Sequence, residues 1–343
     1  MAKKRVMVAL SGGVDSSVAA LILKKAGYEV VGLTMLLWSD GGVASNVTLL
    51  EQVCHILDIQ MRVIDVEKEF KRYVIDYFCR EYMKGRTPNP CVACNKNIKF
   101  GFLLDYTISS GFDYVATGHY ARVEKCNEAY HLLKGLDRNK DQSYMLYTLG
   151  QNKLKHILFP LGEYSKAEVR RLAKQSRLPN ADRPASQDLC FITSDYRSFL
   201  RRYLQPARGM IIDSCGKVVG EHEGVMFYTV GQRHKLGLAT GEPVYVVKID
   251  AANNTLVVGR EQELYRSRCM VTDVNWVSGE APKEPVEVVA KIRYKSPEEP
   301  AVLYPGKEMA EVVFRNMQRA ITPGQAVVFY CGDEVIGGGT IDG

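Results

Sequence analysis

The fold of this chain is decided by the stretch Arg5-Val6-Met7-Val8-Ala9-Leu10-Ser11-Gly12-Gly13-Val14-Asp15-Ser16-Ser17. Its first six residues are mostly apolar and predict a buried strand, whereas residues 16–26, followed by Gly27, predict a helix with a glycine C-cap. The two glycines between them allow left-handed backbone angles and the close approach of another molecule. Unpaired N–H groups at the start of the helix favour an anion there. The stretch therefore predicts a strand, an anion-binding turn and a helix.

Strand and helix signals alternate through the first 200 residues. Strands are predicted at residues 29–36, 60–66 and 114–118. Helices are predicted at residues 46–57 (capped by Asn46 or Thr48), 67–84 and 97–109. Such alternation is typical of a doubly wound parallel sheet, in which ligands bind at the carboxyl ends of the strands. We therefore expect the Ser11 and Gly118 loops, which both follow strands, to share one site.

Beyond about residue 205 the sequence has the pattern of short strands between turns. Strands are predicted at residues 209–213, 244–249, 255–259 and 325–330. This pattern favours antiparallel β modules, with a division near residues 264–270. We expect an α/β catalytic domain over 1–204, a small central β-rich domain over 205–268 and a C-terminal β-barrel over 269–343.

Composition narrows the class of protein. The 343 residues are 46% hydrophobic and 24% charged, which is typical of a globular protein, and the net charge of +6 permits an anionic partner. The most apolar stretch, residues 30–38, is about half as long as the ~20 residues that span a membrane. The basic N-terminus lacks the pattern of a signal peptide. We therefore expect a cytoplasmic protein without a membrane partner.

The turn at residues 11–17 has the chemistry of a phosphate cradle. Ser11, Ser16 and Ser17 supply hydroxyl groups, and Asp15 would repel phosphate unless it faced a magnesium ion. The chain has no Gly-x4-Gly-Lys-Ser/Thr loop, which disfavours transfer of a γ-phosphate. An ordinary glycine-rich turn is the alternative. The heptad resembles the PP-loop of ATP pyrophosphatases, which form adenylates and release pyrophosphate, so the resemblance implies ATP with Mg²⁺.

Three of the nine cysteines lie in unusual surroundings. Cys91 and Cys94 form a Cys-x-x-Cys pair after a proline-rich loop, and Cys190 lies in a second short segment. We expect Cys94 near a helix N-terminus, where a thiolate is stabilised. The other six are interpreted as small buried hydrophobic residues: Cys54, Cys79, Cys126, Cys215, Cys269 and Cys331.

Seven motifs along the chain together resemble the tRNA-specific 2-thiouridylases. They are Asn89-Pro90 with Cys94-Asn95-Lys96, Gly118-His119-Tyr120-Ala121-Arg122, Lys140-Asp141-Gln142-Ser143-Tyr144, Ser186-Gln187-Asp188-Leu189-Cys190-Phe191, Tyr228-Thr229-Val230-Gly231-Gln232-Arg233, Arg293-Tyr294 and Thr322-Pro323-Gly324-Gln325-Ala326-Val327. With the turn at residues 11–17 they extend from Ala9 to Gly339 in the order of that family. The resemblance implies a PP-loop domain of the adenine nucleotide alpha hydrolase type, followed by the two β-rich domains.

The resemblance also implies an activity and a set of site residues. The family uses ATP to activate O2 of uridine 34 in the tRNA anticodon loop, and a sulfur carried as a persulfide then replaces that oxygen. Cys94 would be the nucleophile and Cys190 the persulfide carrier, supplied by a sulfur-donor protein. ATP would contact Ala9, Leu10, Ser11, Gly12, Gly13, Val14, Asp15, Ser16, Met35 and Gly118. The target base would meet Asn89, Pro90 and Cys91. Other tRNA contacts would be His119, Lys140, Asp141, Gln142, Arg293, Tyr294 and Gln325.

The chemistry of the residues agrees with this reaction. Uracil O2 is a poor leaving group and AMP a good one, while thiolates and persulfides are strong nucleophiles at neutral pH. One feature departs from the family, since many members have Asp where this chain has Cys91. The thiolates of Cys91, Cys94 and Cys190 are the ligand set of a 4Fe–4S cluster with one open iron, from which a hydrosulfide would be delivered. A zinc site or an inert extra thiol is the alternative.

Further interpretations stay open from sequence alone. The run from Arg197 to Tyr203 alternates arginine with aromatic residues, which suits single-stranded RNA, or else forms a solvated helix face. His119 is either a site residue or a core histidine, and Asp188 is either a base or a loop cap. For the whole protein, the rivals are a PP-loop ligase that adenylates a small acid or nucleotide, and a non-catalytic RNA-binding protein that senses ATP.

Overall fold

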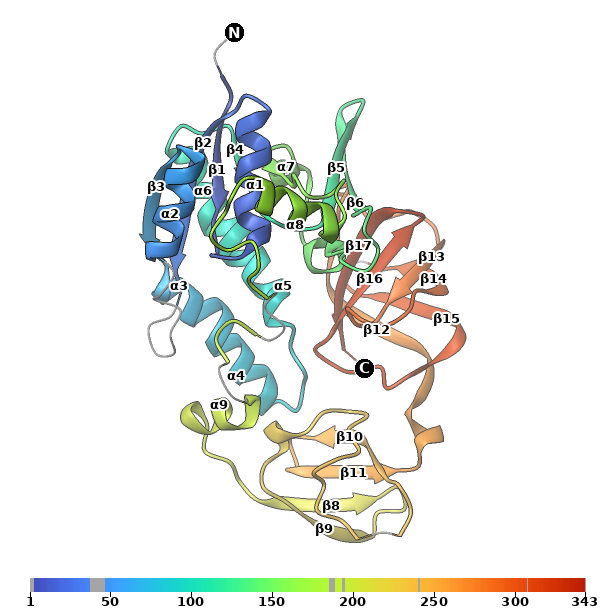
Figure 1. The fold of residues 1–343 in the computed structure, drawn as a ribbon. Coiled ribbons are helices and arrows are strands. Elements are labelled where there is room, and N and C mark those ends of the chain that lie inside the picture. Colours follow the sequence, from blue (N-terminus) through green and yellow to red (C-terminus); the bar gives the residue numbers. More distant parts are fainter. Residues whose placement is uncertain are drawn as a thin grey trace.

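The computed structural model describes residues 3–37, 47–184, 189–192, 195–239, 241–306 and 308–342. Figure 1 shows three regions: a parallel sheet with its helices, a small β domain below it, and a β-barrel beside both. The predicted fold class is thereby confirmed. No helix in the described ranges is both long and apolar enough to cross a bilayer.

The first region is a five-stranded parallel sheet in the order β3-β2-β1-β4-β7. Its strands are β1 (Arg5–Ala9), β2 (Glu29–Leu36), β3 (Gln60–Asp65), β4 (Tyr114–Ala116) and β7 (Ile157–Leu158). Val6 and Val8 of β1 pack with α1 (Val14–Lys25), α2 (Val47–Leu57) and α8 (Lys166–Gln175) in one core cluster. Met7 and Ala9 pack on the opposite face with α6 (Leu103–Ser109). Burial on both faces explains why β1 reads as a continuous apolar run.

Two predicted helices differ from the observed ones in where they begin or in containing a π-helical segment. The helix expected over 97–109 begins earlier, as α5 (Pro90–Cys94), and continues through the π-helix η2 (Asn95–Phe102) into α6. The helix expected over 67–84 is α3 (Glu67–Phe70), the π-helix η1 (Lys71–Ile75) and α4 (Asp76–Met83). Proline at the first helical position fits the early start, because its missing N–H is not needed there. The proposed cap Asn46 lies outside the described residues.

The middle region is a four-stranded sheet in the order β10-β11-β8-β9. Its strands are β8 (Gly209–Asp213), β9 (Val218–His222), β10 (Tyr245–Asp250) and β11 (Thr255–Gly259). The expectation of antiparallel pairing is wrong for one pair, since β11 and β8 run parallel. Strands β8 and β9 are antiparallel, and so are β10 and β11. The long connection between β9 and β10 lets these two strands run in the same direction, so β11 runs parallel to β8.

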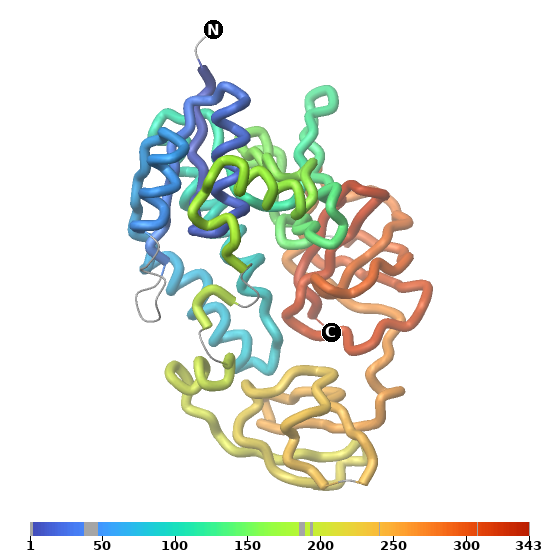
Figure 2. Tube along the Cα trace, in the orientation of Figure 1, coloured from blue at the N-terminus to red at the C-terminus, as the bar shows by residue number. Residues whose placement is uncertain are grey.

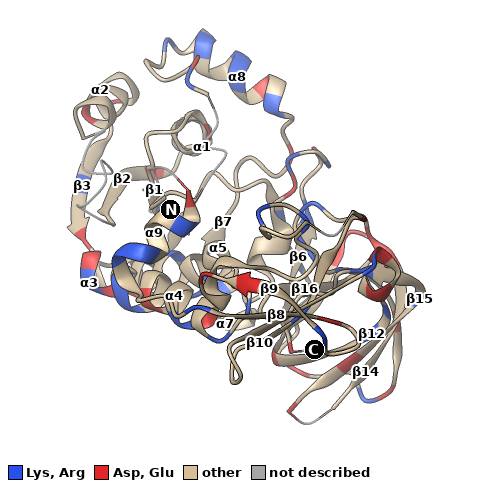
Figure 3. Cartoon of the chain, turned by 90° about the horizontal axis from the view of Figure 1, so that it is seen from below, with Lys and Arg blue, Asp and Glu red and all other residues tan. Residues whose placement is uncertain are grey.

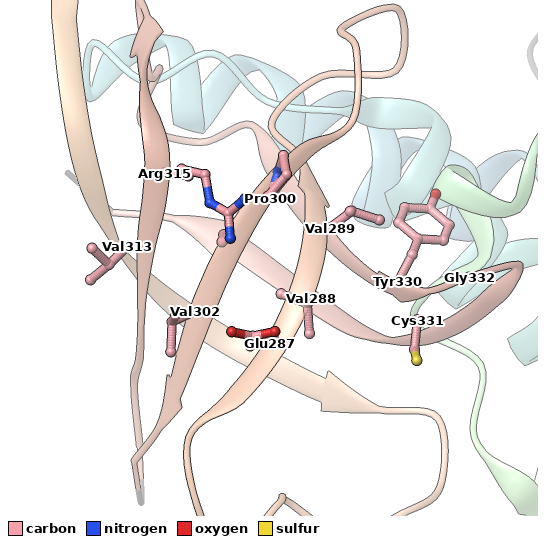
Figure 4. A pocket seen from close by; sticks show the side chains of 11 residues that line it. Glu287, Val288, Val289, Pro300, Val302, Val313, Arg315, Tyr330, Cys331 and Gly332 are labelled. Atoms are coloured by element: carbon pink, nitrogen blue, oxygen red, sulfur yellow. The ribbon is translucent and has the colours of Figure 1, made fainter.

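The third region is a closed barrel of six strands. It contains β12 (Tyr265–Trp276), β13 (Val286–Lys291), β14 (Glu299–Pro305), β15 (Ala310–Arg319), β16 (Ala326–Cys331) and β17 (Glu334–Ile341). The order β12-β15-β14-β13-β16-β17 is closed by pairing of β12 with β17. Closure removes free sheet edges. A shallow hollow on the barrel, between Glu287 and Arg315 and bordered by Tyr330, lies on strands β13 to β16 (Figure 4).

A hairpin from the first region extends the barrel sheet, which the sequence did not reveal. The hairpin is β5 (Ala121–Cys126) and β6 (Ala129–Lys134), and β6 pairs with β17 at Leu133 and Glu334. Lys134, almost fully buried, donates to Gly332 O at 2.9 Å and forms an ion pair with Glu298 at 2.7 Å. Figure 2 shows this green hairpin beside the red barrel strands. The parallel-sheet region and the barrel therefore share one hydrophobic core.

The cysteines outside the site divide into two groups. Cys54, Cys79 and Cys269 are buried, as expected for small hydrophobic residues. The same expectation is wrong for Cys126, Cys215 and Cys331, which are exposed in or beside turns between strands. A lone cysteine gives no sequence signal that separates these two environments.

Candidate active site

The turn after β1 has the conformation of an anion cradle. Gly12 has a left-handed φ of 80°, which its lack of a side chain permits. The Ser16 and Ser17 hydroxyls donate to Gly13 O at 3.1 and 3.2 Å, and the Ser11 N–H donates to Ser16 Oγ at 3.2 Å. Helix α1 begins directly after it at Val14. The first turn of α1 therefore points its free N–H groups towards the loop, where a phosphate is stabilised.

Asn180 holds this turn from behind and was missed in the sequence. Its side chain is 2% exposed, and Nδ2 donates to Gly12 O at 3.1 Å and to Ser17 Oγ at 2.9 Å. Its Oδ1 is buried and has no partner among the described residues. An asparagine some 160 residues from the loop carries no motif, so only the fold reveals it.

Asp15, the residue expected to face magnesium, is bonded to protein groups. The Lys166 ammonium lies 2.5 and 2.7 Å from its two carboxylate oxygens, and the Tyr120 hydroxyl donates to Oδ1 at 2.9 Å. Lys166 follows Ser165, the N-cap of α8, whose capping box with Glu168 fixes the start of that helix. The repulsion between Asp15 and a phosphate is thus relieved by a lysine from α8.

The Gly118 loop lies against the cradle, as predicted from the sheet. A Cβ on Gly118 would lie 2.7 Å from Ser16 N and 2.8 Å from the Asp15 carbonyl carbon. The remaining predicted nucleotide contacts, Ala9 and Leu10 at the end of β1 and Met35 near the end of β2, lie at the same carboxyl edge. The structure therefore brings the predicted ATP residues together.

The Cys-x-x-Cys pair lies on α5. Asn89 is the N-cap and its side chain accepts from the Val92 N–H at 3.3 Å, while Pro90 occupies the first helical position. Cys91 is exposed in the first turn, and Cys94 is buried at the end of the helix. Burial raises the pKa of the Cys94 thiol, so the expectation of a thiolate stabilised at a helix N-terminus is wrong. Cys94 lies too far along the helix, and desolvation dominates.

Cys190 is brought to Cys94 by its neighbour Phe191. The Phe191 ring is buried and makes edge contacts with Phe78 and Phe199, with ring centroids 5.4 and 5.1 Å apart. Phe191 and Cys94 belong to the same core cluster, against which Met35 also packs. Cys190 itself is exposed. The two cysteine segments therefore lie on one side of the molecule, beside the nucleotide edge of the sheet.

The three thiols act on one another and share one cation. Burial, followed by the neighbouring Cys94 and Cys91, raises the pKa of the Cys190 thiol to about 12. Burial also raises the pKa of the Cys91 thiol, which reaches solvent but is surrounded by protein. The Lys99 ammonium lowers the pKa of all three thiols and opposes part of these shifts. Lys99 is on the π-helix η2, and no sequence signal indicated it.

The three thiols do not form a metal centre in this conformation. Within the described ranges no three His, Cys, Asp or Glu side chains are grouped so that they could hold a metal ion. The residue types suit an iron–sulfur cluster, but their arrangement does not. Ser186, Gln187 and Asp188, which precede Cys190, lie outside the described residues.

Two of the predicted tRNA residues hold the loop after β6. The Asp141 carboxylate accepts from the Gly135 N–H at 2.9 Å and from the Ser143 hydroxyl at 2.8 Å. Gln142 exchanges hydrogen bonds with the backbone of Tyr120, at 3.1 and 2.8 Å. Their neighbour Lys140 is exposed. Lys140 is thus the member of this group that is free to meet a phosphate.

The barrel residues of the predicted tRNA set lie close to the same loop. Burial raises the pKa of the Tyr294 hydroxyl, and the nearby Asp141 and Cys91 raise this pKa further. Arg293 donates to Ala320 O and to Thr322 Oγ1, at 3.2 Å for the latter. The barrel thus reaches the rim of the Cys91 segment.

His119 is a core residue in this structure. Its ring is 8% exposed, its Nδ1 lies 2.7 Å from Thr117 Oγ1, and it packs beside Phe100 and Phe159. Burial, assisted by Lys99, holds the pKa of His119 well below its usual range. The ring is therefore neutral at pH 7, which agrees with the core alternative.

The arginine and aromatic run forms α9 (Tyr196–Tyr203). Phe199 faces the core, whereas Arg197 and Arg201 lie over the rings of Tyr228 and Phe227 at 5.2 and 4.6 Å. Figure 3 shows this basic helix beside the central domain. Its aromatic residues are engaged in packing, so the helix offers charge to a phosphate backbone and no free ring to a base.

Comparison with known proteins covers almost the whole chain. Three family profiles match in succession: a tRNA methyl transferase HUP domain over residues 4–194, a tRNA methyl transferase PRC-barrel domain over 197–260 and an aminomethyltransferase beta-barrel domain over 266–341. The tRNA-specific 2-thiouridylase MnmA of Carboxydothermus hydrogenoformans is 47% identical, covering 99% of this chain and 98% of that protein. The MnmA protein of Geobacillus thermodenitrificans is 48% identical, covering 98% and 94%.

Among solved structures, the chain is similar to the U34-tRNA thiolase NcsA from Methanococcus maripaludis with its 4Fe–4S cluster. The two share 19% identity over 58% of this chain and 63% of the other, with a TM-score of 0.37. A likeness at this level says nothing of the site.

The contact between the Gly118 loop and the cradle predicts that Gly118→Ala weakens ATP binding. Overpacking of this kind costs about 1–3 kcal/mol, so we expect the ATP Kd to rise roughly 5- to 150-fold. Titration calorimetry with a non-hydrolysable ATP analogue measures the change. Gly150→Ala is the matched control, because a Cβ there would meet nothing closer than 3.7 Å. Equal affinities for both variants would contradict the arrangement.

The raised pKa of Cys190, about 12, predicts a strong pH dependence of its alkylation. The thiol is protonated at pH 7, and only the thiolate reacts, so the rate should rise about tenfold per pH unit. Peptide mass spectrometry after iodoacetamide treatment between pH 7 and 9.5 measures this. Lys99→Met removes the shared cation and should slow the reaction at every pH, whereas Lys99→Arg should not. A plateau below pH 9 would rule out the assigned environment.

Proposed function

The chain belongs to the tRNA-specific 2-thiouridylases, and from this premise we propose which of its residues perform the reaction. The protein is an enzyme that thiolates tRNA at the expense of ATP. The observation that carries the assignment of roles is the meeting of two sites. The cradle and Gly118 lie at the carboxyl edge of the sheet, and Cys94 and the Cys190 segment share a core cluster against which Met35 of β2 packs.

In the first step the cradle binds ATP and the uridine is activated. O2 of uridine 34 attacks the α-phosphorus, an adenylated uridine forms, and pyrophosphate leaves. The N–H groups at the start of α1 and the Ser11 hydroxyl are the donors for the phosphates, and the Ser16 hydroxyl joins them by leaving Gly13 O. Mg²⁺ supplies neutralisation of phosphate charge when ATP is bound. Asp15 would become available to that ion only by exchanging its Lys166 partner.

In the second step sulfur replaces the adenylated oxygen. Cys190 carries a persulfide received from a sulfur-donor protein, and its terminal sulfur attacks C2 and displaces AMP. Cys94 then attacks the Cys190 sulfur, so that the S–S bond to the transferred sulfur breaks with its electron pair left on that sulfur. The products are 2-thiouridine and a Cys94–Cys190 disulfide, which a thiol reductant must return to two thiols. Lys99 is placed to favour the anionic sulfurs in these steps.

An iron–sulfur route is the second candidate, and Cys91 is the observation that favours it. Cys91 lies within electrostatic reach of Cys94, and both act on Cys190. The arrangement observed does not hold a metal, however. The reaction above is therefore derived from the thiols alone, with Cys91 at the rim where the target base enters.

We assign the remaining contacts to tRNA by their place around this site. Asn89, Pro90 and Cys91 are closest to the attacked base, while Lys140 and the arginines of α9 meet the backbone. The domains over 205–268 and 269–343 extend this grip beyond the catalytic domain over 1–204. Since the substrate is tRNA, we place the reaction in the cytoplasm.

Two rival functions make different demands on the cysteines. A ligase that adenylates a small acid explains the cradle, yet it leaves the clustering of three thiols without a purpose. An RNA-binding protein that senses ATP would not need thiols at all. The three functions are therefore distinguished by whether turnover requires the thiols of Cys94 and Cys190.

Cys94→Ser and Cys190→Ser should each abolish 2-thiouridine formation, because each removes one of the two sulfurs that the transfer requires. The assay incubates unmodified tRNA with ATP, a persulfide donor and each variant, and quantifies nucleosides by mass spectrometry. Pyrophosphate release should persist, since adenylation precedes sulfur transfer. Cys215→Ser, an exposed thiol in the central domain, is the control. Thiolation by Cys94→Ser at the unaltered rate would reject the proposed role of Cys94.

Anaerobic purification followed by iron and sulfide analysis separates the two sulfur routes. On the thiol route we expect substoichiometric iron, and Cys91→Asp should keep most of its activity because Cys91 carries no sulfur. On the iron–sulfur route the protein should contain about four irons per chain, and Cys91→Asp should lose both the iron and the activity. Full turnover by iron-free protein would exclude the cluster, and loss of turnover with the iron would exclude the thiol route.

A further inference from the structure

The loop that leads into the cysteine helix has few backbone donors of its own. It reads Thr87-Pro88-Asn89-Pro90, and proline has no N–H group. Only Thr87 and Asn89 can donate a backbone hydrogen bond within it. Backbone carbonyls that are withdrawn from water require partners, so those of this loop must find donors elsewhere. The position of the loop therefore depends on groups outside it.

Asn89 O accepts from the Ala93 N–H of the following helix, whereas the partners of the Thr87 and Pro88 carbonyls come from the C-terminal barrel, more than two hundred residues later. The side-chain amide of Gln325 donates to Thr87 O at 2.9 Å, and Pro88 O lies 3.5 Å from the same nitrogen. In the opposite direction, the Thr87 N–H donates to Pro323 O at 2.8 Å. One turn of the barrel thus binds both the N–H and the carbonyl of Thr87.

The barrel turn and the loop are also in direct backbone contact. Gly324 has a left-handed φ of 89°, and a Cβ there would lie 2.9 Å from Thr87 N and 3.0 Å from Arg86 Cβ. Arg86 forms an ion pair with Asp342 at 2.6 Å and donates to Ile341 O at 3.0 Å. The chain enters the loop already anchored to the end of the barrel, and Figure 2 shows the two segments side by side.

We infer that Gln325 is a positioning residue, which holds the loop at residues 87–90 so that Cys91 and Cys94 stand where the target base is presented. This inference rests on the proposed function and gives Gln325 a role within the protein beside the tRNA contact implied by family resemblance. Gln325 acts on the loop through its side-chain nitrogen, which donates to Thr87 O. The barrel thereby controls the geometry of the catalytic domain.

The test compares Gln325→Ala with Gln318→Ala in the full-length protein. Gln318 is on the same barrel, and its amide bonds only to Asn316 O on its own strand. Loss of a hydrogen bond to the half-buried Thr87 carbonyl should speed exchange of the Thr87 amide roughly three- to tenfold without tRNA, by hydrogen-exchange mass spectrometry. The kcat for thiolation should fall at least tenfold, and by a larger factor than the Kd for tRNA rises. Gln318→Ala should alter none of these.

A different outcome would overturn the assignment. Unchanged exchange at Thr87 together with weaker tRNA binding would show that Gln325 contacts tRNA directly. If Gln325→Ala loosens the whole fold, amide exchange also rises in α1. Gln325→Glu is then the test variant, because it keeps the size of the side chain and removes the donor. Unchanged exchange at Thr87 in Gln325→Glu would equally refute the role. Absence of thiolation in the unaltered protein would refute the proposed function while leaving the exchange result standing.

Discussion

Close backbone contact between two loops is the constraint on which the site depends. The Gly118 loop approaches the first turn of α1 so closely that no side chain fits between them. A helix start attracts an anion only if its N–H groups stay free. The neighbouring groups respect this condition: Asn180 donates to the Gly12 carbonyl and the Ser17 hydroxyl, and Lys166 binds the Asp15 carboxylate. They satisfy the acceptors of the turn and leave the first N–H groups of α1 to a ligand.

The turn after β1 favours an anion, whereas the surroundings of the three thiols disfavour the thiolate, which is their reactive form. Protein around the three thiols raises their pKa, and each thiolate would raise the pKa of its neighbours further. Among the described residues, the Lys99 ammonium opposes this shift at all three thiols. An α-helix would place a residue five positions after Cys94 about 140° away around the axis. The wider turn of the π-helix η2, whose hydrogen bonds span five residues, reduces this angle, and Lys99 lies within electrostatic reach of Cys94.

The sequence was informative where local chemistry determines the structure. Gly12 and Gly118 follow strands of a parallel sheet, and the topology of such a sheet brings their loops together without further information. Asn180 and Lys166 could not be found, because their partners are more than 150 residues away and neither belongs to a motif. The hairpin β5–β6 was missed since its partner strand is β17. Cys94 was misjudged electrostatically, because burial is a property of the packed fold and outweighed the helix end.

The barrel is attached firmly to the parallel-sheet region that holds the candidate active site. Domains of one chain usually move relative to one another unless their interface is large and apolar. Here the hydrophobic core of the parallel-sheet region continues into the barrel through Tyr330 and Val335. The buried Tyr144 hydroxyl donates to Ala326 O at 2.8 Å, and Asn275 of the barrel donates to Tyr147 O at 2.7 Å. The barrel and the helix that carries Cys91 are therefore held in one arrangement by a shared core and by hydrogen bonds.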